Sequence, residues 1–344
     1  MIFLSYYPTY SELDAVIAQY QPKQVNVFVD LKNCMGGLHL DEAAKNVLLA
    51  NENSKGPVTD IYSSWLDFVT FHYQYMFKNV CNMHLFMIAD TGKSQYHQDI
   101  YKDYKCNRAI TSYKTLSIME QDQIRSIIKN NLEVIMKTSH HLFNMHDVYL
   151  FYCESDFCPH YYIQKQYQDE KFLNIIYSSD KDMLQTLVYP NTVQFVRHGR
   201  ENKMWLNQYN WHERLKLEEH MPVGNYVYMK SLMGDAGDNV PSVPGIGLKS
   251  AYSLVKNATL SSLDDLKTHI ELQAKKKNTK AFKVLDHWQD VERNYKLVGF
   301  DPLIKNLSMR TVEFLNNAMK DERLGLADTA AFLKTMKERL GERC

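Results

Sequence analysis

Acidic residues recur at the ends of short apolar runs in this chain. VNVFVD (25–30) and LFMIAD (85–90) each end in aspartate, and VYLFYC (148–153) is followed by a Glu-x-Asp pair. FLNIIYSSD (172–180) ends on the first residue of an Asp-x-Asp pair, and two more aspartates stand three residues apart in MGDAGDN. The eight carboxylates are Asp30, Asp90, Glu154, Asp156, Asp180, Asp182, Asp235 and Asp238.

This pattern predicts a metal site. If the runs are parallel strands, their carboxyl ends meet at one edge of a sheet, where so many carboxylates repel one another strongly without cations. Oxygen ligands without His or Cys suit a hard ion, so we expect Mg²⁺ or Mn²⁺. Two such ions about 4 Å apart are the usual machinery for cleaving phosphodiesters. The alternative, that each aspartate caps a following helix, stays open for any single member but explains the whole set poorly.

A second candidate segment is DTGKSQYHQDIYKDYKCNR, which follows the second apolar run. Lys102, Lys105 and Arg108 recur in it at three-residue spacing, with tyrosines interleaved, so a helix would place them near one face. Cations bind phosphates and tyrosine faces stack on bases, which suits a nucleic-acid strand. A solvated, salt-bridged helix is the commoner outcome of such a pattern and the better interpretation of this segment alone.

The stretch GDAGDNVPSVPGIGLKSA contains a tight Pro-Gly-Ile-Gly turn before a helix expected to start near Leu248. Glycines there let a backbone approach closely, and the helix N-terminus with Lys249 forms an anion site suited to a nucleic-acid phosphate. An ordinary loop between helices is the alternative for the turn by itself. The whole stretch is more specific, because it joins two metal-type aspartates to a phosphate-binding turn.

The elements that must position these residues are those of an α/β protein. The buried runs, with a fifth at 192–199, predict a parallel sheet. We expect helices at 60–80, 115–139, 157–168, 210–219, 226–233, 248–256, 280–297 and 310–338, and a lysine-rich linker or loop at 274–283. We therefore divide the chain into an N-terminal extension (1–24), an α/β core (25–205) and a helical region (206–344).

Composition sets limits on function. Lys+Arg and Asp+Glu are both 40, so the chain does not coat polyanions by bulk charge, although a local basic groove is compatible with this balance. The six cysteines form no Cys-x-x-Cys pair, which predicts reduced thiols and a cytoplasmic location. No apolar run reaches the roughly 18 residues of a membrane span.

Together the motifs resemble those of the 5′-nuclease (flap endonuclease) superfamily, which includes bacteriophage 5′→3′ exonucleases, phage-type RNase H and the N-terminal domain of bacterial DNA polymerase I. GDAGDNVPSVPGIGLKSA resembles the helix–three-turn–helix motif (about 226–256), a DNA-binding motif of the helix–hairpin–helix type. FVDLKN, CESD and SSDKDMLQTL resemble the strand-end acidic motifs. The Tyr-Lys…Arg segment resembles the base of a helical arch (about 96–140), and ERNYKLVGF resembles the helix that closes the core.

The resemblance implies a PIN/5′-nuclease-like fold and a two-metal-ion 5′→3′ exonuclease/flap endonuclease. Its expected substrates are 5′ ends and single-strand/duplex junctions of DNA or RNA–DNA hybrids, cut during removal of primers or flaps in phage replication. It also implies a monomer without membrane association, in the host bacterial cytoplasm if viral, with a single-strand-binding protein or clamp as candidate partner. The first metal site would comprise Asp30, Asp90, Glu154, Asp156 and Asp180, and the second Asp182, Asp235 and Asp238.

The remaining residues receive roles from the same resemblance. Lys105 would act at the scissile phosphate with Arg108 beside it, and Tyr104 would be a stacking platform for a base. Lys102 and His97 would contact nucleic acid. The hairpin Gly245–Gly247 with Lys249 would hold the duplex backbone, with a K⁺ ion on the hairpin carbonyls.

Two positions depart from the family pattern. Phe157 stands where a second aspartate usually follows Glu-x-Asp, and His97 stands where an arginine is common. Two alternatives follow. A PIN-type RNase shares the acidic core but lacks the helix–three-turn–helix, and a structure-specific DNA-binding protein with a weakened site is favoured by Phe157.

Overall fold

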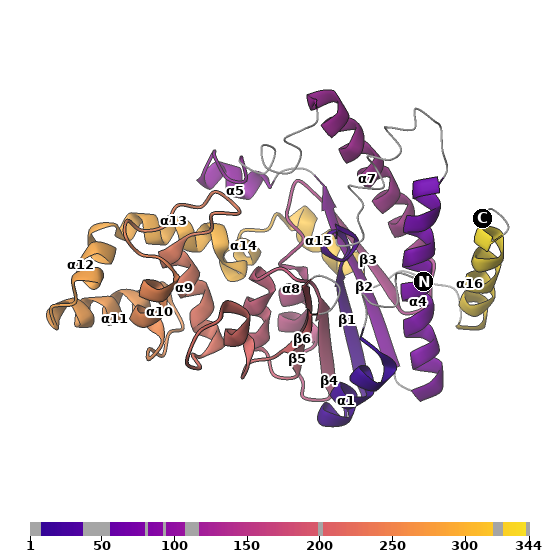
Figure 1. Ribbon diagram of the computed structural model, residues 1–344, viewed down its shortest axis with the longest axis horizontal. Coiled ribbons are helices and arrows are strands. Elements are labelled where there is room, and N and C mark those ends of the chain that lie inside the picture. Colours follow the sequence, from indigo (N-terminus) through magenta and orange to yellow (C-terminus); the bar gives the residue numbers. More distant parts are fainter. Residues whose placement is uncertain are drawn as a thin grey trace.

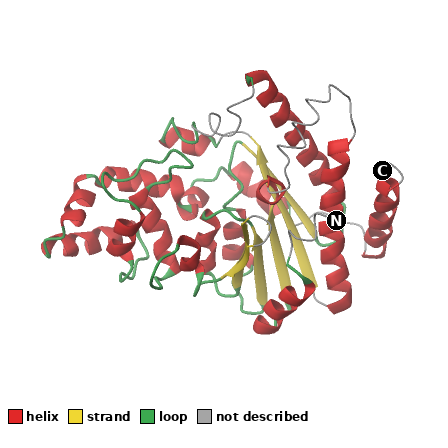
Figure 2. Ribbon diagram, viewed as in Figure 1, coloured by secondary structure: helices red, strands yellow, loops and turns green. Residues whose placement is uncertain are grey.

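The protein is built around one six-stranded sheet (Figures 1 and 2). The strand order is β3-β2-β1-β4-β5-β6, and all pairs are parallel except the last, between β5 and β6. Our computed structural model describes residues 8–36, 56–79, 82–91, 94–106, 117–198, 202–318 and 326–341. The strands are β1 (Gln24–Asp30), β2 (Asn82–Thr91), β3 (Met145–Phe151), β4 (Phe172–Tyr177), β5 (Thr192–His198) and β6 (Asn202–Leu206).

Helices cover both faces of the sheet, which is why its strands are almost continuously apolar. Along β1, Val25, Val27 and Val29 belong to the core cluster shared with α4 (Gly56–Asn79) and α7 (Ile118–Ser139). Phe28 points to the opposite face and belongs to the cluster shared with α8 (Cys158–Gln166). The five expected strands are therefore confirmed, whereas β6 was not predicted.

The two ends of the chain are part of this fold. The helix α1 (Tyr10–Tyr20) buries Leu13 completely in the sheet core, and Asp14 accepts a 2.5 Å hydrogen bond from Tyr75 on α4. The C-terminal helix α16 (Leu326–Gly341) packs against α4 and adds Leu333 to the same core (Figure 1). The segment expected as an N-terminal extension thus contributes a core helix.

Most of the helices after residue 206 form a helical region beside the β6 edge of the sheet (Figures 1 and 2). Its core continues from the sheet, because Val196 of β5 and Leu206 of β6 pack in one cluster with its helices. Its helices are α9 (Tyr226–Met233), α10 (Leu248–Val255), α11 (Leu263–Lys275), α12 (Thr279–Asp286), α13 (Trp288–Val298), α14 (Phe300–Lys305) and α15 (Met309–Asn317). The structure is thus a mixed α/β fold with a helical C-terminal region.

Several helix boundaries differ from the sequence prediction. The expected helix at 280–297 is interrupted at His287, and that at 310–338 is divided between α15 and α16. Only a short 3₁₀ helix, η3 (Trp211–Leu215), forms within 210–219. The lysine-rich stretch at 274–283 is not a linker: Lys277 adopts a left-handed turn (φ 63°) and Asn278 caps α12, so α11 and α12 form a tight hairpin.

The region expected as a helical arch (about 96–140) has three parts. It begins with the short helix α5 (Gln95–Ile100) and ends with α7, whose Leu132, Ile135 and Met136 are buried in the sheet core. Residues 107–116 between them lie outside the described residues, as does Arg108. None of the helices described here is long and apolar enough to cross a lipid bilayer.

Candidate functional site

The first group of acids lies at the carboxyl ends of the central strands, where Asp30, Asp90, Asp156 and Asp180 are near enough to influence one another's ionisation. Asp30 ends β1 and accepts a 2.8 Å hydrogen bond from Ser178, which follows β4. Asp90 lies at the end of β2 and accepts hydrogen bonds of 2.9 and 3.0 Å from the backbone N–H and Oγ of Ser155. Because Ser155 stands between Glu154 and Asp156, this contact ties the Glu-x-Asp pair to its neighbouring strand.

Burial and mutual repulsion perturb these carboxyls. Burial, together with the smaller effect of the nearby Asp180 and Asp90, raises the pKa of Asp30 to about 7 despite the hydrogen bonds that Asp30 accepts. Burial and the nearby Asp180 and Asp30 hold the pKa of Asp156 well above its ordinary value. Without added positive charge, the strand-end site therefore resists full ionisation.

Three lysines supply part of the missing charge, and only one of them, Lys105, is predicted from the sequence. Lys32 lies 2.5 Å from Asp90, and Lys105 pairs with Glu154. Lys230, only 3% exposed on α9, pairs with Asp182 and lies 2.7 Å from Asp235. The available signals were local: Lys32 follows Asp30 by two residues, and Lys230 precedes Asp235 by five.

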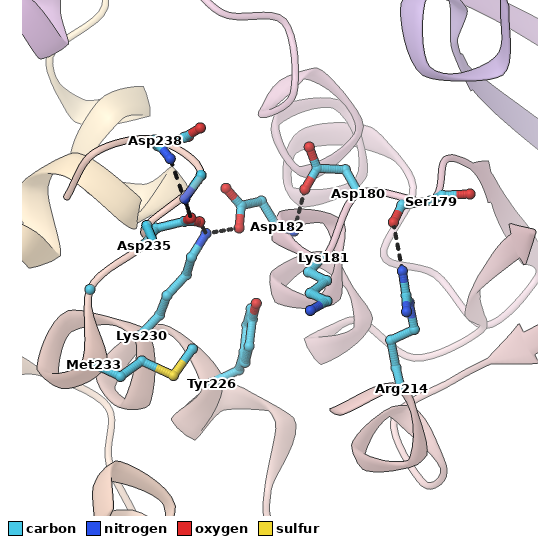
Figure 3. Close-up of a pocket in the computed structure, with 13 residues that line it drawn as sticks. Ser179, Asp180, Lys181, Asp182, Arg214, Tyr226, Lys230, Met233, Asp235 and Asp238 are labelled. Carbon is cyan, nitrogen blue, oxygen red and sulfur yellow. Dashed lines mark hydrogen bonds and ion pairs between the residues drawn. The ribbon is translucent and has the colours of Figure 1, made fainter. Parts of the chain in front are cut away.

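The second acidic group lies between the sheet and α9. Asp182, Asp235 and Asp238 each place one carboxylate oxygen within 4.8 Å of the others. Figure 3 shows the Lys230 ammonium between Asp235 and Asp182 in this cleft, with Arg214 farther along its wall. Burial raises the pKa of Asp182 to about 7 even though Lys230 lowers it. Lys230 itself keeps a pKa well above normal, because the attraction of Asp182 and Asp235 outweighs burial.

A glycine-dependent loop presents Asp235 and Asp238. Gly234 has φ 66° and ψ −167°, a conformation that is essentially restricted to glycine, and a Cβ there would lie 2.4 Å from the carbonyl oxygen of Val240. Asp235 and Val240 exchange two backbone hydrogen bonds of 2.9 and 2.8 Å, which close the loop. From α13, the buried Asn294 donates to the Pro241 carbonyl at 2.7 Å, so the loop is fixed from both sides.

The Tyr104–Lys105 segment joins the two acidic groups. Tyr104 donates from its hydroxyl toward Glu154 (3.0 Å) and Asp238 (3.1 Å). Lys105 has a left-handed backbone (φ 56°), and its N–H donates to the Asp238 carbonyl at 2.8 Å. Its ammonium, paired with Glu154, is also 3.5 Å from Asp238. Lys105 is therefore held between the two groups by its backbone as well as by its charge.

Two expected contacts with nucleic acid do not agree with the burial of the side chains. Tyr104 is 5% exposed and its ring stacks on His97 at 4.5 Å, while His97 is 3% exposed and bonded to Ser94 at 2.6 Å. Neither ring offers a free face, so in this arrangement Tyr104 supports the carboxylates and His97 supports Tyr104. Burial lowers the pKa of His97, which disfavours the charged form that a phosphate would need. Lys102 is exposed.

The expected phosphate-binding hairpin lies between α9 and α10. Gly245 has φ 77°, the buried Ile246 anchors the turn by donating its N–H to Val243 at 2.9 Å, and Gly247 and Lys249 are exposed. Lys283 of α12 reaches the same turn, since its Nζ would lie 3.4 Å from a Cβ on Gly245. The turn thus presents backbone and cations to solvent on one surface.

Comparisons with known proteins show which proteins this chain is similar to. Residues 221–314 match the family model "5′-3′ exonuclease, C-terminal SAM fold". The 5′-3′ exonuclease of Bacillus subtilis is 25% identical over 62% of this chain and 64% of its own length, and DNA polymerase I of that organism is 26% identical over 53% of this chain and 19% of its own. The T5 5′-exonuclease with bound divalent metal ions (zinc) superposes with a TM-score of 0.61 at 19% identity, over 86% of this chain and 99% of the phage protein.

The chain is thus similar in sequence to 5′-3′ exonucleases, most specifically over residues 221–314, and it shares the fold of the phage T5 5′-exonuclease. The bacteriophage T5 flap endonuclease in complex with DNA and metal ions gives a TM-score of 0.62 at 19% identity, over 86% of this chain and 98% of that protein. The matched region spans less than two thirds of the two Bacillus subtilis relatives. The structural likeness establishes the fold that the motif resemblance predicted.

Phe157 is the clearest departure of the site from the motif pattern of the superfamily that the sequence resembles. Its side chain is fully buried and contacts Tyr161 edge to face, as part of the apolar cluster that also contains Phe28. The position that the family gives to an acid therefore belongs to the core in this protein, next to the raised-pKa carboxyl of Asp156.

The remaining donors fit divalent cations. Both acidic groups consist of carboxylate oxygens, the preferred ligands of hard ions. The raised pKa values of Asp30, Asp156 and Asp182 indicate that positive charge is still insufficient despite the lysines. A cation at each group would stabilise the ionised carboxylates.

Proposed function

We propose that this protein is a divalent-metal-dependent 5′ nuclease that hydrolyses phosphodiesters at 5′ ends and single-strand/duplex junctions of DNA or RNA–DNA hybrids. The observation that carries the proposal is the pair of adjacent acidic groups with Lys105 held between them. The family resemblance and the T5 flap endonuclease in complex with DNA and metal ions support it.

In this proposal the strand-end group holds one cation and the Asp182, Asp235 and Asp238 group holds the other. Two metal ions would supply an activated water and stabilisation of the leaving oxygen. The protein's own part is positional. Lys105 lies where it can neutralise a phosphate between the groups, and the Tyr104 hydroxyl bridges Glu154 and Asp238 and so fixes their spacing.

The hairpin around Gly245 would bind the duplex part of the substrate. Its exposed backbone, Lys249 and Lys283 can contact phosphates without reading the base sequence. A junction preference then follows, because one surface holds duplex while the acidic cleft holds the strand that is cut.

The finer parts of the proposal rest on the motif resemblance. They are Mg²⁺ as the natural ion, K⁺ on the hairpin carbonyls, monomeric action in a bacterial cytoplasm, and removal of primers or flaps in phage replication, with a single-strand-binding protein or clamp as partner. At the hairpin, the Lys283 ammonium lies beside the turn and would compete with K⁺ for the same place.

Cleavage of a 5′-end-labelled flap substrate tests the proposal. The purified protein is assayed in Mg²⁺, in Mn²⁺ and in EDTA, beside Asp182→Asn and the control Asp169→Asn, which changes an exposed aspartate just before β4. We expect metal-dependent release of short 5′ products by the wild type and the control. Asp182→Asn should bind the junction but not cut it.

A second candidate function is a structure-specific DNA-binding protein with a disabled site, which Phe157 favours. Junction binding without cleavage by the wild type in either metal would support that reading. Normal cutting by Asp182→Asn would show that the metal-site assignment is wrong.

A further inference from the structure

Two exposed aromatic residues stand beside the candidate site with a constrained backbone. Phe151 ends β3 with 58% of its surface exposed, and Tyr152 follows it with 72% exposed. Tyr152 has φ 59°, in the left-handed region that bulky side chains rarely adopt. They are the one consecutive pair among the large apolar side chains that the described residues leave exposed. Strain of this kind persists where the surrounding structure enforces it, and it concentrates at functional sites.

The surroundings fix this pair rigidly at the rim of the site. Phe151 is paired with Thr91, the residue after Asp90, and its ring meets Tyr149 edge to face at 4.9 Å. The carbonyl of Tyr152 accepts a 3.1 Å hydrogen bond from the N–H of Gln95, the first residue of α5. Both aromatic rings are therefore carried on backbone that is tied to β2 and to α5.

The chain then leads directly into the acidic groups. Glu154 follows Tyr152 by two residues and contacts both Tyr104 and Lys105. Ser155, one residue further, donates to Asp90. The aromatic pair is thus continuous along the chain with residues of the candidate catalytic cleft.

The chemistry of the pair matches unpaired bases. Tyrosine and phenylalanine faces stack on any base, whereas the bases of a duplex are already stacked and paired. Tyr104, the aromatic expected to stack a base, is buried against His97, so it does not offer this surface. We propose that Phe151 and Tyr152 form a stacking platform for unpaired bases of the nucleic-acid strand that enters the cleft. This inference rests on the proposed function and names the part of the substrate that these residues bind.

Binding to two matched flaps tests the platform without using cleavage. Both substrates have the same duplex and backbone, but one flap carries normal bases and the other carries abasic residues. In EDTA, we expect the wild type to bind the base-bearing flap about fivefold or more tightly than the abasic flap. Tyr152→Gly and Phe151→Ala should reduce this preference, and the double variant should lose it.

Tyr152→Gly is informative because glycine accepts φ 59° without strain, so its thermal unfolding temperature should be unchanged or raised. The matched control is Tyr209→Ala, which removes a 69% exposed tyrosine after β6, at the opposite edge of the sheet. This control should keep the preference for the base-bearing flap.

The platform is refuted if the wild type binds both flaps equally or if the double variant keeps the preference. Cleavage of the two flaps in Mg²⁺ tests the proposed nuclease function independently of the platform. Cleavage without flap discrimination refutes the platform alone, whereas discrimination without cleavage supports the platform and refutes the nuclease.

Discussion

Lys230→Met tests whether the buried Lys230 ammonium stabilises the fold by compensating the negative charges of Asp182 and Asp235. The substitution keeps an unbranched side chain of similar length but removes the ammonium that pairs with Asp182 and lies 2.7 Å from Asp235. Lys230 is 3% exposed, so water cannot replace the lost charge. Removing one partner of a buried ion pair costs about 3–5 kcal/mol, because the other charge is left uncompensated.

The expected readout is thermal unfolding in EDTA and in excess Mg²⁺. For a chain of this size each kcal/mol corresponds to roughly 2 °C, so Lys230→Met should unfold about 6–10 °C below the wild type in EDTA. A cation held by Asp182, Asp235 and Asp238 would restore positive charge at the same place. Mg²⁺ should therefore stabilise the variant more than it stabilises the wild type.

The control is Lys256→Met, which breaks an ion pair of 2.5 Å with Glu219 on the exposed surface. Solvent screens that pair, so its loss should leave the unfolding temperature nearly unchanged. Equal unfolding temperatures of Lys230→Met and wild type in EDTA would refute the compensating role of the buried ammonium. A large loss that Mg²⁺ does not recover would refute the second metal site.

Three further predictions concern the loop, the chemical step and acid stability. Gly234→Ala should destabilise the protein by roughly 2–4 kcal/mol in urea unfolding, because its Cβ would lie 2.4 Å from the Val240 oxygen in a glycine-only conformation, and an unchanged midpoint would contradict this. Lys105→Ala should slow single-turnover cleavage about a hundredfold while junction affinity changes little, and a pure affinity loss would exclude a role in the chemical step. Burial lowers the pKa of His72 to about 4, so the unfolded chain, with a pKa near 6.5, takes up the proton first. Stability should therefore fall as the pH drops from about 6.5 towards 4, by roughly 2–3 kcal/mol at pH 4.5 from this residue. His72→Gln should show a correspondingly flatter dependence in urea unfolding between pH 7 and 4.5, and an equally steep one would refute the assignment.

Local patterns were sufficient for the elements with strong periodicity. The apolar run ending in Asp30 and the one before Glu154 were read as strands, because both faces of a parallel strand are buried and the pattern is visible within seven residues. α9 was predicted with its observed bounds, Tyr226–Met233. β6 was not predicted, because NKMWL is short and of mixed polarity and therefore shows no clear strand pattern. It forms a strand through its pairing with β5, which is a tertiary contact.

Within the site, the sequence by itself determined the acids and their chemistry. Carboxylates at strand ends carry their own signal, because strand periodicity and parallel pairing together fix where they point. It also determined part of the loop that holds Asp235, since the conformation of Gly234 is essentially restricted to glycine. These residue types suggested phosphodiester cleavage, and the family resemblance specified a 5′ nuclease.

Only the tertiary structure decided which lysines pair with the acids and which aromatic rings are exposed to solvent. Lys230 meets Asp182 across 48 positions, and Tyr104 meets Glu154 across 50, distances over which no sequence pattern extends. Tyr104 and His97, which were expected to contact nucleic acid, are buried in the structure. Phe151 and Tyr152 are aromatic residues that are exposed instead. Exposure depends on what the rest of the chain packs against a side chain, so residue type and spacing could name the aromatic candidates but not choose among them.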